Sequence, residues 1–222
     1  MELFLDTADA QAAAELSNVL TVAGVTTNPT IITSSGKTPE EVVSGMCAVL
    51  APEQKLFVQV IDMTSVDAVL ADARRIMEVR PENIYVKIPV TEVGLAAIKR
   101  AKAEGIGVLA TAIYSADQGF LAAMNGADYL APYVNRMCNL GDGVGQVIEL
   151  NEMLAHAGLD SKIIAASFKN SYQVHELIAA GVHSVTVPVD VCRALYLHPA
   201  TEPAVDAFTG AWESAYGRRT FA

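Results

Sequence analysis

The feature that most constrains this chain is a regular alternation between short apolar runs and longer segments of helical pattern. Several of the runs are rich in β-branched residues, which favour strands. Eight such runs are found: Leu3–Asp6, Gly24–Thr26, Leu56–Ile61, Ile84–Ile88, Val108–Ile113, Tyr129–Tyr133, Ile163–Ser167 and Ser184–Val187. Strands that alternate with helices pair in parallel through right-handed crossovers. Eight such units predict an α/β fold, an eight-stranded parallel (β/α)8 TIM barrel.

Helix start and stop signals lie between the runs. Thr38-Pro39-Glu40-Glu41 offers a capping residue, a proline at the first helical position and a glutamate three residues after the cap. Ser115-Ala116-Asp117-Gln118 has the spacing of a second capping box. Glu104-Gly105 and Ala180-Gly181 are typical of helix ends. In residues 65–79 the apolar positions fall on one helical face, which predicts a helix packed on the sheet.

The length of 222 residues fits one barrel domain, residues 1–222, because such barrels commonly have about 250 residues. The runner-up is an open doubly wound sheet. No G-x-G-x-x-G follows an early strand and no G-x-x-x-x-G-K-S/T is present, so nucleotide-binding versions of that fold are not favoured. Residues 201–216 predict an extra C-terminal helix carrying Phe208, Trp212 and Tyr216 at four-residue spacing. This aromatic stripe either packs on its own barrel or contacts a second subunit.

Composition narrows the classes of partner. The net charge of −10 argues against sequence-independent binding of nucleic acid, which needs basic clusters. No uncharged run approaches the roughly 18 residues of a membrane helix, and we identify no secretory signal. Three cysteines without paired spacing predict reduced thiols in a cytoplasmic protein. The four histidines are scattered, so we expect no metal site.

Polar side chains recur near the carboxyl ends of the predicted strands, where a β/α barrel carries its reacting groups. These residues are Asp6, Asn28, Gln59, Lys87, Thr111, Tyr133 and Ser167. Successive members lie 22 to 34 residues apart, which is close to the length of one βα unit, so we expect their side chains to converge on one mouth of the barrel.

Lys87 is the most informative of these residues. It lies in Ile84-Tyr85-Val86-Lys87-Ile88-Pro89, and the period of two places it on one face with Tyr85 while Val86 and Ile88 point toward the helices. We expect the lysine to point into the barrel. Burial lowers the pKa of an amine, and a neutral amine can attack a carbonyl to form an imine. An imine accepts electrons from an adjacent carbon–carbon bond, so this chemistry needs no cofactor.

The neighbouring groups have matching roles. The Tyr133 hydroxyl can move protons, directly or through a water, and Gln59 and Thr111 can hold that water. Asp6 is the natural partner of a substrate hydroxyl or of the lysine amine. Arg136 follows the sixth run, and we predict that it binds a phosphate together with Ser167, which precedes a helix N-terminus.

Taken together, these residues resemble a known family, the transaldolases, and most closely its short branch, the fructose-6-phosphate aldolases. The resemblance covers nearly the whole chain through the segments Leu5–Ala8, Gly24–Thr30, Val58–Val60, Val86–Thr91, Ala131–Arg136 and Ala165–Lys169. Thr26, Asn28 and Ala131 lie within these segments and are expected to line the substrate site. The chain departs from the family pattern at Met137-Cys138, where that pattern has an aliphatic residue and an aspartate.

The resemblance implies a barrel with its Schiff-base lysine at Lys87. It implies cleavage of fructose 6-phosphate to dihydroxyacetone and glyceraldehyde 3-phosphate, small sugar partners, and a homodecamer in which the C-terminal helix crosses between subunits. Transaldolases carry a glutamate at the water-holding position and typically a phenylalanine in the sixth-strand motif. Gln59 and Tyr133 therefore resemble the aldolase branch.

Three alternatives remain beside the aldolase. A transaldolase would transfer the three-carbon unit to an acceptor sugar. An imine-free phosphosugar isomerase or epimerase would need a paired acid and base at the strand ends, and we find no such pair of carboxylates or histidines. A non-catalytic barrel would bind phosphosugars without turnover.

Overall fold

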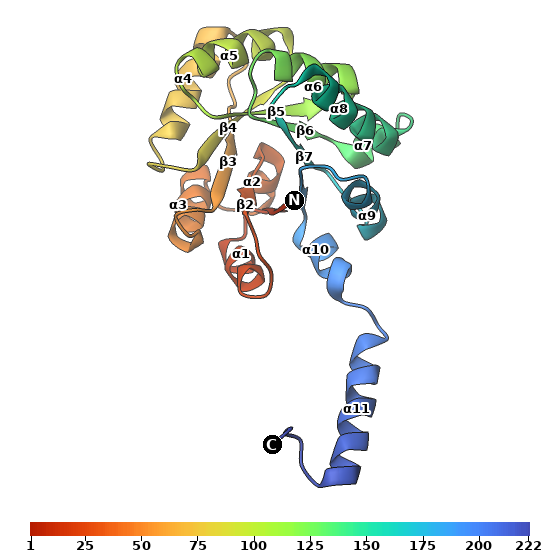
Figure 1. Ribbon diagram of the computed structural model, residues 1–222. Helices are drawn as coiled ribbons and strands as arrows, with labels where there is room; N and C mark the ends of the chain where they lie inside the picture. Colours follow the sequence, from red (N-terminus) through yellow and green to blue (C-terminus); the bar gives the residue numbers. More distant parts are fainter.

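The computed structural model, which describes residues 1–222, contains a closed barrel of eight parallel strands in the order β1-β2-β3-β4-β5-β6-β7-β8 (Figure 1). The predicted TIM barrel is therefore confirmed. The strands are β1 Glu2–Asp6, β2 Gly24–Thr26, β3 Lys55–Gln59, β4 Ile84–Pro89, β5 Val108–Ile113, β6 Tyr129–Pro132, β7 Lys162–Ala165 and β8 Ser184–Val187.

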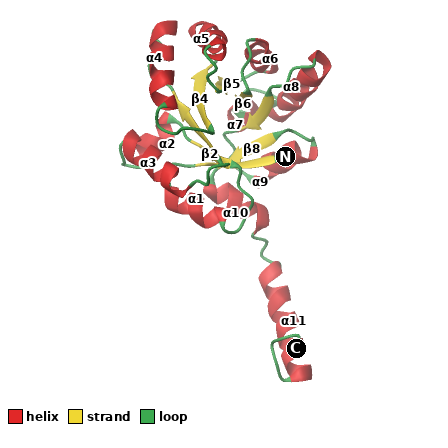
Figure 2. Cartoon of the chain, turned by 60° about the vertical axis from the view of Figure 1, so that its left-hand side comes forward, coloured by secondary structure: helices red, strands yellow, loops and turns green.

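Helices surround the barrel (Figure 2). They are α1 Ala10–Ser17, α2 Pro29–Ser34, α3 Pro39–Val49, α4 Val66–Met77, α5 Glu92–Ala103, α6 Ala116–Met124, α7 Val134–Cys138, α8 Gly143–Ala157, α9 Ser171–Ala179, α10 Val189–Tyr196 and α11 Thr201–Tyr216. The predicted capping box is present at Thr38 and Glu41. The predicted face of α4 is buried at Val69, Leu70 and Ala73.

Some local predictions were wrong. Three strands end earlier than expected, at Gln59, Pro132 and Ala165, because the chain turns at the barrel mouth. Tyr133 precedes the short helix α7, and Ser167 has a left-handed φ of 63°, which breaks an extended strand. Helices α2 and α7 were not predicted. At the start of α6 only half of the capping box forms, because the Gln118 side chain accepts from Tyr114 N.

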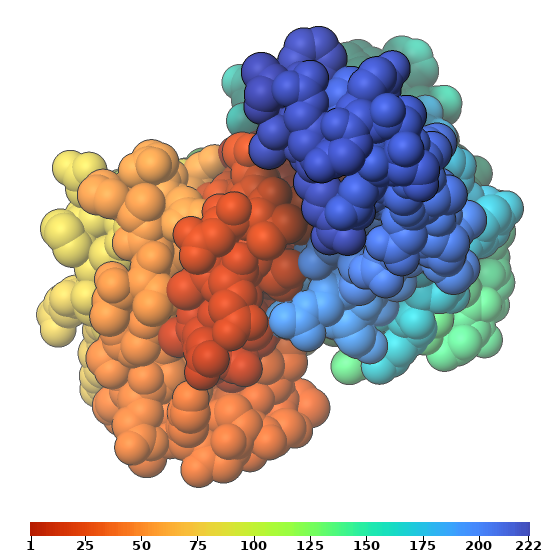
Figure 3. Space-filling view, turned by 90° about the horizontal axis from the view of Figure 1, so that it is seen from below, coloured from red at the N-terminus to blue at the C-terminus, as the bar shows by residue number.

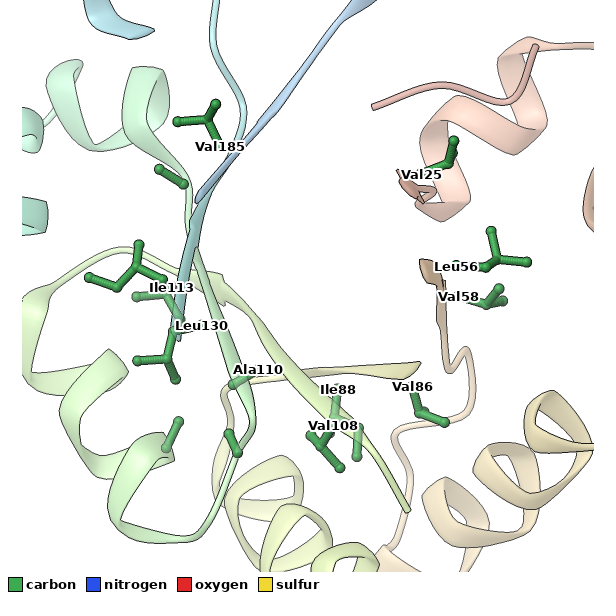
Figure 4. Packing of buried hydrophobic residues seen from close by; sticks show 14 of the residues in the cluster. Val25, Leu56, Val58, Val86, Ile88, Val108, Ala110, Ile113, Leu130 and Val185 are labelled. Atoms are coloured by element: carbon green, nitrogen blue, oxygen red, sulfur yellow. The ribbon is translucent and has the colours of Figure 1, made fainter. Parts of the chain in front are cut away.

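The two faces of the strands bury different sets of side chains. Outward residues such as Val86 and Ile88 belong to the large core between strands and helices, as the sequence predicted. Figure 4 shows members of this core pointing away from the barrel axis, including Val25, Leu56 and Val185. The inward residues form a second, smaller cluster: Phe4, Phe57, Leu109, Tyr129, Ala131, Ile164 and Ala166. The barrel interior is therefore a packed apolar layer beneath the mouth.

The opposite, N-terminal end of the barrel is closed by an ion pair and aromatic rings. Lys55 donates to Glu2 and lies 5.7 Å from the Phe4 ring centroid. The rings of Phe57 and Tyr85 stack at 5.0 Å, and Tyr129 meets Tyr85 edge-on at 5.2 Å. This floor and the apolar layer above it limit the access of water from below.

Helix α11 does not pack on the barrel. None of its residues is buried, and it stands away from the other helices at the end of the chain (Figures 1 and 2). Figure 3, seen from the side toward which α11 projects, shows it in dark blue, standing in front of the lighter blue segment that precedes it in the chain. The prediction of a helix at 201–216 is confirmed, whereas the alternative that its aromatic stripe packs on its own barrel is wrong. No helix combines the length and the apolar character that a membrane span requires.

Candidate active site

Lys87 lies inside the barrel on β4 and is 4% exposed. Its Nζ donates a hydrogen bond at 2.6 Å to the carbonyl oxygen of Thr27, the residue that follows β2, two strands away in the barrel. Burial lowers the pKa of Lys87 from its ordinary 10.5, although the charge of Asp6 acts in the opposite direction. The amine is therefore more readily neutral than a lysine in water, as a nucleophile requires.

Tyr133 and Thr111 form a hydroxyl pair on the β5–β6 side of the mouth, with 3.1 Å between Thr111 Oγ1 and Tyr133 OH. Burial raises the pKa of Tyr133 above its usual 10, although Thr111 and Arg136 lower it. The phenol thus keeps its proton at neutral pH and is available as an acid. Thr111 lies within an irregularity of β5, where the register with β6 shifts between Ala110 and Ile113 and Ala112 has a φ of 55°.

Gln59 is paired with Lys87 in the β3–β4 register and therefore lies on the same inward face. Its Oε1 atom is buried and has no hydrogen-bond partner in the chain. A buried acceptor without a partner is unfavourable unless a water or ligand satisfies it. This atom fits the predicted role of Gln59 in holding a water.

Asp6 ends β1 and accepts a hydrogen bond from Thr26 Oγ1 at 2.8 Å. Burial raises the pKa of Asp6 above its ordinary 3.8, although Lys87 and Thr26 lower it. Thr26 is fully buried behind Asp6 and also contacts Thr186 Oγ1 at 2.7 Å. Asn28 caps α2 through its side-chain oxygen, which leaves its amide nitrogen to donate to a ligand.

Arg136 lies on α7 and is exposed. Its Nη1 donates to Tyr114 OH at 3.0 Å, and its guanidinium lies 4.9 Å from the centroid of the Tyr133 ring. Ser167 lies two residues after β7 and contacts α7, because its backbone carbonyl accepts a hydrogen bond from Asn135 N at 3.3 Å. Both residues thus lie where the chain leaves late strands, and Ala131 is buried in the interior cluster beneath them.

The site is thus a buried lysine amine at the mouth of the barrel, surrounded by the Asp6 carboxylate, the Tyr133 phenol and several hydroxyl and amide groups. A family model described as transaldolase/fructose-6-phosphate aldolase matches residues 3–218. The chain belongs to the transaldolase/fructose-6-phosphate aldolase family. It is an enzyme of that family, whose chemistry proceeds through a Schiff base and whose substrates are sugar phosphates.

Sequence reasoning missed three neighbours of the family site. Thr27 offers its backbone carbonyl to Lys87, Thr186 contacts Thr26, and Tyr114 holds Arg136. A backbone carbonyl leaves no signal in side-chain patterns. Thr186, however, occupies an inward position of the eighth predicted strand, and that period-two placement was the available signal.

Asp6 should destabilise the fold at neutral pH. Because burial raises the pKa of Asp6 above 3.8 in the folded protein, ionisation of this carboxyl is less favourable in the folded state than in the unfolded state. The free energy of unfolding is therefore highest below the unfolded-state pKa and falls as pH rises through the folded-state pKa. An Asp6→Asn variant stays neutral, so its free energy of unfolding at pH 7 should exceed that of the parent by on the order of 1 kcal/mol. Urea unfolding at pH 7 and at about pH 4 tests this, since the gain should disappear at the lower pH.

The matched control for this prediction is Asp160→Asn, a change at an exposed carboxyl in the loop between α8 and β7. It should leave the free energy of unfolding unchanged at both pH values. An Asp6→Asn protein that is less stable than the parent at pH 7 would contradict the expected gain.

Proposed function

We propose that this family member is a class I aldolase that reversibly cleaves fructose 6-phosphate to dihydroxyacetone and glyceraldehyde 3-phosphate. The observation that carries the proposal is the buried Lys87 amine, whose pKa is lowered by burial, in a mouth that also holds Tyr133 and Gln59. No bound cofactor is needed, because the imine formed on the lysine is itself the electron acceptor.

In the proposed reaction the neutral Lys87 amine attacks the C2 ketone of the sugar and forms a carbinolamine. Tyr133, through a water held by Gln59 and Thr111, supplies the proton with which the C2 hydroxyl leaves as water. The protonated imine remains. The same relay takes the proton of the C4 hydroxyl, and the C3–C4 bond breaks with its electron pair passing to C3.

Glyceraldehyde 3-phosphate then leaves as an aldehyde, and an enamine stays on Lys87. The enamine gains a proton at C3 and water hydrolyses the resulting imine, which releases dihydroxyacetone and restores the amine. Asp6 and Asn28 hold hydroxyls of the donor, Thr26 and Ala131 line its site, and Arg136 with Ser167 binds the phosphate.

The alternative is a transaldolase, which passes the dihydroxyacetone unit to an acceptor such as erythrose 4-phosphate. Gln59 and Tyr133 favour the aldolase, because transaldolases carry a glutamate and typically a phenylalanine at the two corresponding positions. The test is incubation with fructose 6-phosphate alone, followed by assay of free dihydroxyacetone. Release without an acceptor supports the aldolase, and strict dependence on erythrose 4-phosphate supports the transaldolase.

The proposed phosphate site leads to a specific expectation for Arg136. An Arg136→Ala variant should raise KM for fructose 6-phosphate by roughly 10- to 100-fold, the loss of one charge-assisted hydrogen bond. Steady-state kinetics should show a much smaller change for the condensation of dihydroxyacetone with unphosphorylated glyceraldehyde. Arg100→Ala, at an exposed arginine bonded to Asp67, is the control and should leave both KM values unchanged. Equal effects on both substrates would contradict the phosphate role.

We also propose that the chain forms a homo-oligomer, the decamer implied by the resemblance, through α11. Phe208 and Tyr216 are 72% and 61% exposed there. Replacing both with glutamate should yield smaller species in light scattering, because exposed aromatic side chains at an interface would become charged. Met124→Glu, at a residue that is exposed elsewhere, should leave the molar mass unchanged. An unchanged mass for the double variant would place the interface elsewhere.

A further inference from the structure

Thr186 is a buried polar residue that the proposed mechanism does not use. It lies on β8 between Val185 and Val187, points into the barrel and is 2% exposed. Valine has nearly the same shape and would occupy this position without the unfavourable burial of a hydroxyl. The Thr186 hydroxyl has one hydrogen-bond partner in the chain, Thr26 Oγ1 at 2.7 Å.

Counting protons fixes the direction of this hydrogen bond. Thr26 Oγ1 carries a single hydrogen and lies close to two oxygens, Asp6 Oδ1 at 2.8 Å and Thr186 Oγ1. An ionised carboxylate only accepts, so the Thr26 hydrogen points to Asp6. Thr186 must then donate to Thr26. The chain of donors runs from Thr186 through Thr26 to Asp6, across 160 residues of sequence between the two threonines.

The two threonines are sealed from solvent, whereas Asp6 is only partly buried and lies at the mouth. The two threonine hydroxyls therefore lie on the side of Asp6 that faces away from the mouth, and Thr26 donates its hydrogen bond to one of the two carboxylate oxygens. The other oxygen is left for the lysine amine or for a sugar hydroxyl. Consecutive hydrogen bonds polarise one another, so the Thr186 hydroxyl strengthens the bond from Thr26 to the carboxylate.

We infer that Thr186 is a positioning residue for the proposed aldol cleavage, whose hydroxyl orients Thr26 so that Thr26 holds the Asp6 carboxylate ionised and aimed at the substrate. The inference rests on the proposed function, because it assigns Asp6 a role in that reaction. The charged and titratable groups that face Asp6 are Lys87 on β4 and Tyr133 at the start of α7. Both are unchanged in the variants that test the inference.

The test compares Thr186→Val, which keeps the shape and removes the hydroxyl, with Thr186→Ser, which keeps the hydroxyl. Without the donor chain Asp6 takes up a proton more readily, so the acid limb of the kcat/KM profile should move to higher pH in Thr186→Val. The loss of kcat/KM relative to the parent should be largest on the acid limb, where it should reach roughly tenfold, and small on the plateau where Asp6 is ionised in both proteins. Thr186→Ser should follow the parent profile.

Ser184→Ala is the matched control, because Ser184 is a fully buried hydroxyl on the same strand that donates to the Ile163 carbonyl instead. It should leave the pH profile unchanged. Thr186→Ala is a second variant without the hydroxyl and should shift the acid limb as Thr186→Val does, so that the test stands if the valine protein does not fold. A parent-like profile for the hydroxyl-free variants, or an equal shift in Thr186→Ser or Ser184→Ala, would overturn the inference.

Trapping of the parent enzyme with fructose 6-phosphate and borohydride is run in parallel. Absence of an adduct on Lys87 contradicts the proposed function itself. An adduct on Lys87 together with an unshifted Thr186→Val profile contradicts only the role of Thr186.

Discussion

Replacing Lys87 with methionine is expected to lower kcat/KM for fructose 6-phosphate by on the order of 10⁴-fold or more, because the nucleophile that forms the imine is removed. Methionine has a similar length and suits a buried position, so the fold should persist. Treatment of the parent protein with fructose 6-phosphate and sodium borohydride should add the mass of a reduced sugar fragment to the peptide that contains Lys87. The Lys87→Met protein should gain no such mass.

Lys55 provides an internal control for this experiment. It is the other lysine of the barrel interior, but it lies at the floor, away from the mouth, and is paired with Glu2, so it should stay unmodified. Lys99→Met, at an exposed lysine of α5, should keep both activity and trapping. An adduct on Lys55, or trapping that persists in Lys87→Met, would mean that the reactive amine is not Lys87.

The convergence of the main polar residues could be predicted from the sequence because strand geometry is periodic. Lys87, Gln59 and Thr111 lie on inward positions near the ends of their strands, and parallel strands bring these ends to one mouth. The alternation of apolar runs and helical segments was sufficient for the barrel itself, since eight such units have few other closed arrangements.

The contacts that tune these residues could not be predicted in the same way. The partner of Lys87 is a backbone carbonyl 60 residues away, and its distance depends on how far each strand is staggered around the barrel. Tyr114 and Arg136 meet only because the unpredicted helix α7 turns the chain after Tyr133. The aromatic stripe of α11 has the same sequence pattern whether it packs within the chain or against another, so its separation from the barrel needed the structure.

Replacing Tyr133 with phenylalanine is expected to lower kcat for fructose 6-phosphate cleavage by roughly 10²- to 10⁴-fold, the range of general acid–base catalysis. The ring that packs near Arg136 is kept, so KM should change far less. Imine formation should slow, whereas the final amount trapped by borohydride on Lys87 should match the parent. Rapid-quench trapping at several times separates these two quantities.

The pH profile gives a second readout of the same hydroxyl. In the parent, activity should rise with pH as both Asp6 and Lys87 lose their protons, and the part of the rise that reports Lys87 should occur below 10.5 because burial lowers the pKa of Lys87. It should fall only above about pH 10, because burial raises the pKa of Tyr133 and keeps the acid protonated up to there. Tyr133→Phe should lose this alkaline decline and retain the rise.

Tyr114→Phe is the matched control, since its ring lies 5.7 Å from that of Tyr133 and its hydroxyl serves Arg136. It should raise KM for the phosphorylated sugar and leave kcat and the alkaline limb near those of the parent. A parent-like kcat in Tyr133→Phe would contradict the proposed role of Tyr133 and would mean that another group donates the proton.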